Sequence, residues 1–195
     1  KVDPDAVKFW QVFGSFWWAV GCLGMAEHYR TGPDQSVERP AIGRRSSECQ
    51  VDCVNLLISG PVELVKPDES VTGIDMPRID ELLASVTDFL RQDVMSNTQG
   101  RTNFLARVAS NSLDIVQREV ALGKTCIANE SQRLIELFAC EKSLVDLRWR
   151  LVNGLRDESI GLDLPGLADH LRATVVNQIA IDQPRYAGFT TATKA

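Results

Sequence analysis

Residues 79–94 read IDELLASVTDFLRQDV, and this stretch decides the fold class. Its apolar residues recur at intervals of three and four positions, which places them on one face of an α-helix. A cap and an early proline, Asp75 and Pro77, precede it and are typical of a helix start. The apolar face consists of Ile79, Leu82, Leu83, Val86, Phe89, Leu90 and Val94.

The same spacing recurs along the rest of the chain, and no segment shows the sustained alternation of a half-buried strand. We expect a first helix from about Pro4 to Thr31, roughly 40 Å long at 1.5 Å per residue, and a second from Ser36 to Ile58. Further helices are expected from about 104 to a stop at Gly123, and at 127–139, 143–156 and 163–180. The sequence therefore predicts an all-α protein: a long helical hairpin plus a bundle of about five helices.

Glycine and proline gather between the two helical blocks, at Gly60, Pro61, Pro67 and Gly73. We therefore divide the chain into a helical hairpin (1–60), a linker (61–75) and a helical bundle domain (76–187). Residues 188–195 are small and polar, so we expect them to form a flexible tail.

The composition is that of a globular protein, with 44% hydrophobic and 24% charged residues among 195. A net charge of -5 argues against a nucleic-acid partner, which is usually met by a basic face. No stretch has the roughly 18 uncharged apolar residues of a membrane helix, and no secretory signal is visible. Five cysteines without regular spacing are typical of reduced, buried thiols. We expect a cytoplasmic protein with no metal, no cofactor and no membrane partner.

Two patterns resemble catalytic motifs without completing them. Residues 123–125 (GKT) end like a phosphate-binding loop, but Arg118 stands where that loop needs glycine, and a helix precedes them in place of a strand. We interpret them as a helix end. His28 and His170 are each followed two residues later by an arginine, where a kinase catalytic loop needs an aspartate. The residues therefore predict no catalytic group.

The first expected helix is rich in aromatic residues, namely Phe9, Trp10, Phe13, Phe16, Trp17 and Trp18. These side chains cover more than one stripe of a helix, so the simplest interpretation is a core helix buried on several sides. The alternative is an interaction surface made by Trp10, Phe13, Trp17 and Trp18, because an exposed apolar patch marks a binding site for a partner.

A polar stripe at helical spacing is formed by Arg107, Asn111, Asp114 and Arg118. Such a stripe is most simply a solvated helix face. It could instead join a buried network with the last helix, which offers Arg172 or Asp182.

Residues 3–58 resemble the C-terminal helices of aminoglycoside-phosphotransferase-like kinases, in the branch associated with acyl-CoA dehydrogenases. The resemblance is carried by residues 5–14 (DAVKFWQVFG), 18–23 (WAVGCL), 36–38 (SVE) and 41–45 (AIGRR), and Pro40 departs from it.

Residues 77–186 are similar to a small helical domain of unknown function that is often encoded beside those kinases. The matching stretches are 106–113 (ARVASNSL), 118–119 (RE), 122–123 (LG), 171–175 (LRATV) and 181–186 (IDQPRY).

Together the two resemblances imply a kinase tail joined to its usual neighbour. The family's catalytic and metal-binding residues precede these helices, so none of them is carried over to this chain. We therefore expect a non-catalytic accessory or protein-interaction module of a phosphotransferase system linked to acyl-CoA metabolism. Its expected partners are a kinase core, an acyl-CoA dehydrogenase or a second copy in a homo-oligomer.

Two alternatives stay open. The chain is either the C-terminal fragment of an active ATP-dependent small-molecule phosphotransferase, or a binder of a small anionic ligand. The ligand-binding candidates are Arg107, Asn111, Arg172 and Arg185.

Overall fold

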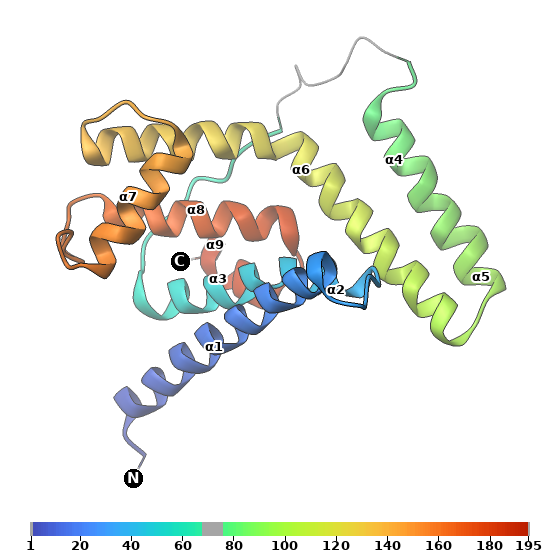
Figure 1. Ribbon diagram of the computed structural model, residues 1–195, viewed down its shortest axis with the longest axis horizontal. Coiled ribbons are helices and arrows are strands. Elements are labelled where there is room, and N and C mark those ends of the chain that lie inside the picture. Colours follow the sequence, from blue (N-terminus) through green and yellow to red (C-terminus); the bar gives the residue numbers. More distant parts are fainter. Residues whose placement is uncertain (1, 68–75, 195) are drawn as a thin grey trace.

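The computed structural model describes residues 2–67 and 76–194, and every regular element within these ranges is a helix (Figure 1). The all-α prediction is confirmed. The elements are α1 (Pro4–Thr31), α2 (Glu38–Arg44), α3 (Ser46–Leu57), α4 (Ile79–Asp88), the π-helical segment η2 (Phe89–Val94), α5 (Met95–Asn97), α6 (Gly100–Phe138), α7 (Leu144–Arg156), α8 (Leu167–Asp182) and α9 (Ala187–Lys194).

The stretch at 79–94 forms α4 and η2, which lie along the first half of α6 (Figure 1). The helix is as expected, but only part of its apolar face is covered. Thr87 is buried, whereas Ile79, Leu82, Val86 and Phe89 on the outer side are each about half exposed.

Helix α6 spans 39 residues and passes through Gly123 without interruption, so the helix stop expected there is wrong. Gly123 is buried, and a Cβ atom at this position would lie 3.2 Å from Oε1 of Glu119. The missing side chain thus makes room for that of Glu119. A single glycine costs a helix only about 1 kcal/mol, which tertiary packing outweighs. The helix ends instead at Ala139, whose left-handed conformation (φ 46°) is typical of a helix C-terminus.

Residues from both sides of the expected boundary at residue 60 pack together in one hydrophobic cluster. Val51 of α3 packs in one cluster with Val176 and Ile179 of α8 and Ala192 of α9. The predicted linker is described only as far as residue 67, and residues 68–75 lie outside the described part. Its first residues are attached to α8, because Val65 donates its backbone N–H to Asn177 at 2.8 Å.

The C-terminal residues form a packed helix in place of the expected flexible tail. Helix α9 buries Gly188 and Ala192 against the core. Arg172, itself buried, donates hydrogen bonds to the carbonyl oxygens of Gly60 (2.6 Å), Ile58 (2.7 Å) and Ala192 (2.9 Å). This one guanidinium therefore ties the end of the hairpin, α8 and α9 together.

The segment expected as one helix from Ser36 to Ile58 is two helices that meet at Arg45. The split lets α2 run close to α1 at Gly43, where an added Cβ would lie 2.8 Å from Cβ of Ala26. Helix α1 packs against both α2 and α3, while its first residues, 4–11, are exposed and project from the rest of the molecule (Figure 1).

Candidate functional site

Helix α1 turns its small side chains toward α2 and α3 and its large ones toward solvent. The half-buried or buried residues recur mostly at three and four positions and are Val12, Ser15, Ala19, Gly21, Cys22, Met25 and Ala26. At 3.6 residues per turn, the opposite side of the helix carries five large aromatic residues, which we call the aromatic face. They are Phe9, Trp10, Phe13, Phe16 and Trp17. The small residues let α2 and α3 approach closely, and they leave the aromatic rings outside.

The aromatic face is open to solvent. Trp10 and Trp17 are 64% and 65% exposed and Phe13 is 46% exposed, so the prediction that these residues form core is wrong. The rings of Phe9, Trp10 and Phe13 contact one another, with centroids 5.3–6.3 Å apart. Trp18 is 44% exposed but lies roughly 140° around the helix from the centre of this face, on the side of Cys22 and Met25 and beside Gly21. The alternative of an interaction surface therefore remains for Trp10, Phe13 and Trp17, whereas Trp18 lies on another side of the helix.

A polar network joins α2, α6 and α8. Arg44 of α2 forms an ion pair with the buried carboxylate of Asp182 at 2.7 Å and a second with Glu119 of α6. Gln178 donates a further hydrogen bond to Asp182 at 3.1 Å. Burial raises the pKa of Asp182, and the positive charge of Arg44 and the hydrogen bonds oppose that rise. The last residue of α8 is thereby fixed against the middle of α6.

Beside this network lies a hollow of about 290 Å³ between α6 and the C-terminal end of α8, which we call the polar hollow. It is lined by Asn111, Asp114, Arg118, Asp182, Gln183, Pro184 and Arg185. Arg118 donates hydrogen bonds to the carbonyl oxygens of Ile181 (2.5 Å) and Asp182 (3.3 Å). Helix C-termini leave carbonyl groups without an intrahelical partner, and Arg118 satisfies two of them here.

The polar hollow brings together two of the four expected ligand residues. Asn111 and Arg185 both line it, whereas Arg107 is exposed and outside it. Arg172 is buried and bound to three backbone carbonyl groups, so it is a structural residue and not a ligand contact. Arg118 was already identified from the sequence as a member of the polar stripe at helical spacing. Gln183 lies in the matching stretch 181–186 but was not singled out as a ligand candidate, because its place depends on how α8 ends.

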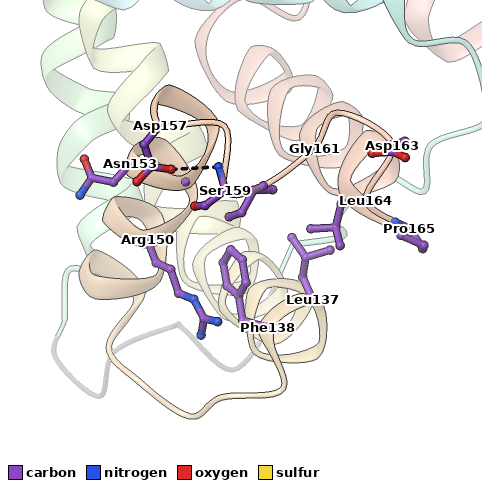
Figure 2. A pocket seen from close by; sticks show the side chains of 12 residues that line it. Leu137, Phe138, Arg150, Asn153, Asp157, Ser159, Gly161, Asp163, Leu164 and Pro165 are labelled. Carbon is purple, nitrogen blue, oxygen red and sulfur yellow. Dashed lines mark hydrogen bonds between the residues drawn. The ribbon is translucent and has the colours of Figure 1, made fainter.

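A cavity of about 700 Å³ forms a bowl at the far end of α6, bordered by α7 and the loop at 157–165 (Figure 2). The guanidinium of Arg150 lies 4.5 Å from the ring centroid of Phe138. Asp157 accepts a hydrogen bond from the backbone N–H of Ser159 at 3.0 Å. In Figure 2 the side chains of Asp157 and Asp163 lie on opposite sides of the bowl. Its charged groups do not converge, so we assign it no function.

The cysteines and histidines do not gather into a reactive centre. Within residues 2–67 and 76–194, no three His, Cys, Asp or Glu side chains are placed to hold a metal ion. Cys22 and Cys49 are buried, and burial raises the pKa of the Cys49 thiol to about 11. His170 is buried and His28 is exposed. Burial also lowers the pKa of His170.

These observations define an all-α protein with an exposed aromatic helix and a polar hollow at the end of α8. In the described part of the chain, no helix is both long and apolar enough to cross a bilayer. Residues 96–186 match a protein family described as a domain of unknown function (DUF6285), which agrees with the resemblance found for residues 77–186. The match includes the whole of α6, α7 and α8 and every residue of the polar hollow. No curated protein and no solved structure matched the chain.

Proposed function

We propose that this chain is a non-catalytic interaction module whose aromatic face on α1 packs against the core of an aminoglycoside-phosphotransferase-like kinase. The observation that carries the proposal is the orientation of α1. Its small residues contact the body of the protein, and its five large aromatic residues point away from it. Large aromatic side chains left in solvent cost free energy, and a partner that covers them recovers it.

The aromatic face has the size of a substantial part of a protein interface. A fully covered Phe or Trp side chain buries about 150–250 Å². The five residues are exposed by 46–65%, which leaves on the order of 600 Å² of apolar surface. A stable complex buries about 800 Å² on each partner, so the face and its rim are large enough to support one. Tryptophan is also among the residues that contribute most to binding energy.

The resemblance of residues 3–58 favours a kinase core as the partner. In that kinase family the equivalent helices form the wall of the acceptor-substrate side of the cleft, and they pack against the core. Helices α1, α2 and α3 would retain this role against a core supplied by another chain. In the alternative, a core precedes α1 in the same polypeptide, and the same face makes the contact within one molecule. The link to acyl-CoA metabolism is likewise part of this proposal, and it rests on the same resemblance.

The experiment mixes the purified chain with an isolated kinase core of this class and measures complex formation by size-exclusion chromatography with light scattering. We expect a one-to-one complex for the wild type. The triple variant W10S/F13S/W17S should weaken it at least a hundredfold. The matched control is W149S, because Trp149 on α7 is 58% exposed and lies outside the aromatic face. Equal binding by both variants would refute the assignment of the face.

The same experiment separates the other partners. Dimers of the wild-type chain alone that the triple variant abolishes would assign the face to self-association. Binding to an acyl-CoA dehydrogenase but not to the kinase core would assign it to that enzyme. Phosphorylation of a small hydroxylated substrate or an acyl-CoA derivative by the purified chain with ATP would refute the proposal that the chain is non-catalytic.

A further inference from the structure

We propose that the polar hollow binds a phosphate group, held by Arg118 and Arg185 with the side-chain amides of Asn111 and Gln183. This site is independent of the aromatic face on α1, which is formed by different elements. The proposal rests on how the charges of the hollow are paired, on which donors remain unused and on the space between them.

Each acidic residue of the hollow already has an arginine partner from outside it. Asp114 pairs with Arg91 at 2.6 Å, and Asp182 pairs with Arg44 at 2.7 Å. Neither carboxylate forms an ion pair with Arg118 or Arg185. Within the described residues neither arginine forms a direct ion pair with a carboxylate, although the charges of Asp114 and Asp182 act on Arg118 from nearby.

The two arginines are held close enough to repel each other. The two backbone hydrogen bonds of Arg118 fix its guanidinium at the end of α8. Arg185 follows Pro184 directly, and the proline fixes one backbone angle of the turn that brings it back to the hollow. Burial lowers the pKa of Arg118, the charges of Asp114 and Asp182 oppose that change, and the nearby charge of Arg185 adds to it. An anion between the two guanidinium groups would relieve that repulsion.

Unused donors surround the space between the arginines. A guanidinium has five N–H groups, and Arg118 uses only Nε and Nη2 on the backbone, which leaves Nη1. The side-chain amides of Asn111 and Gln183 line the hollow and donate no hydrogen bond to any residue in the described part of the chain. Arg185 is exposed and keeps its full set of donors.

The donor set fits a phosphate group better than a carboxylate. The donors come from two elements, the middle of α6 and the segment after α8, so they approach a ligand from two directions. A phosphate group offers three acceptor oxygens and close to two negative charges, whereas a carboxylate offers two coplanar oxygens and one charge. The volume of about 290 Å³ admits a phosphate group with part of the molecule that carries it.

The test is isothermal titration of the full chain with inorganic phosphate at constant ionic strength, with acetate in a second arm. R185Q is the test variant, since Arg185 is exposed and its replacement leaves the core untouched. R107Q is the matched control, because Arg107 is an exposed arginine of the same region of α6 outside the hollow. We expect phosphate binding by the wild type, a Kd at least tenfold higher for R185Q and a Kd within twofold of wild type for R107Q.

Three results would overturn the proposal. The first is no heat of binding at 20 mM phosphate, and the second is an equal loss of affinity in R185Q and R107Q, which would indicate general attraction to positive charge. The third is acetate binding as tight as phosphate, which would make the hollow a carboxylate site. N111A serves as a second variant if R185Q does not fold, and it should also raise the Kd.

Discussion

Replacing Arg172 with methionine should destabilise the protein by about 3–5 kcal/mol, because this buried guanidinium donates three hydrogen bonds to backbone carbonyl groups. Methionine keeps most of the apolar stem and removes all three donors. The three acceptors belong to Ile58, Gly60 and Ala192, in segments far apart in the sequence. The substitution therefore separates the end of α3, α8 and α9 from one another.

The magnitude follows from the number and burial of these bonds. A hydrogen bond from a charged donor contributes about 1.5–3 kcal/mol, so three independent bonds would give roughly 4.5–9 kcal/mol. Ile58 and Gly60 are only half-buried, so water can reach their carbonyl groups in the variant, whereas Ala192 is 1% exposed and its carbonyl loses its partner in a buried place. This lowers the expectation to about 3–5 kcal/mol, a large share of the 5–15 kcal/mol typical of a folded protein.

The assay is urea unfolding followed by circular dichroism at 222 nm. With a slope of about 2 kcal/mol per molar urea, the midpoint should fall by about 2 M. Arg107 is exposed, so R107M should stay within about 0.5 kcal/mol of the wild type. A loss below about 1 kcal/mol in R172M would show that the three bonds do not hold the C-terminal helix, and it would return Arg172 to the set of ligand candidates.

Two further predictions concern packing and pH. Gly43→Ala should destabilise the chain by about 1–3 kcal/mol, because the new Cβ would lie 2.8 Å from Cβ of Ala26. Gly14→Ala, with no atom within 4 Å of the new Cβ, should stabilise α1 by up to about 1 kcal/mol. Urea unfolding measures both changes in stability, and the same sign for both would refute the close approach of α1 and α2. Burial lowers the pKa of His170 in the folded protein, so the unfolded chain binds more protons and the free energy of unfolding should decrease as the pH falls below about 6.5. His170→Gln should reduce this slope, and an unchanged slope in His170→Gln would contradict the burial of this imidazole.

The sequence was sufficient for the fold class, because apolar spacing reports directly on helix faces. It was insufficient for helix ends. Glycine often ends a helix, so a stop was predicted at Gly123. Whether the helix continues there depends on the contact with Glu119 and on the packing of a 39-residue helix. The C-terminal residues are small and polar, so the sequence alone predicted a flexible tail. Their burial depends on Arg172, whose partners lie in distant segments.

The candidate sites were predicted in part. Asn111 and Arg185, which the sequence singled out as ligand candidates, line one hollow, and their role as ligand contacts stays a prediction. The burial of Arg172 was only the less favoured of two interpretations, because a charged residue on an amphipathic helix is usually solvated. The aromatic residues of α1 were misread as core for a related reason: size and hydrophobicity predict burial, but the small residues on the opposite side determine which face of α1 contacts the protein.

The central claim is that the aromatic face of α1 is covered by a kinase core in the functional assembly. Hydroxyl-radical footprinting with mass spectrometry tests it most directly, on the free chain and on the chain mixed with that core. Trp10 and Trp17 are about two-thirds exposed in the free chain, and Trp149 is comparably exposed on α7. The account predicts at least fivefold protection of Trp10 and Trp17 in the mixture and unchanged oxidation of Trp149. Equal oxidation of all three residues in both samples would contradict it.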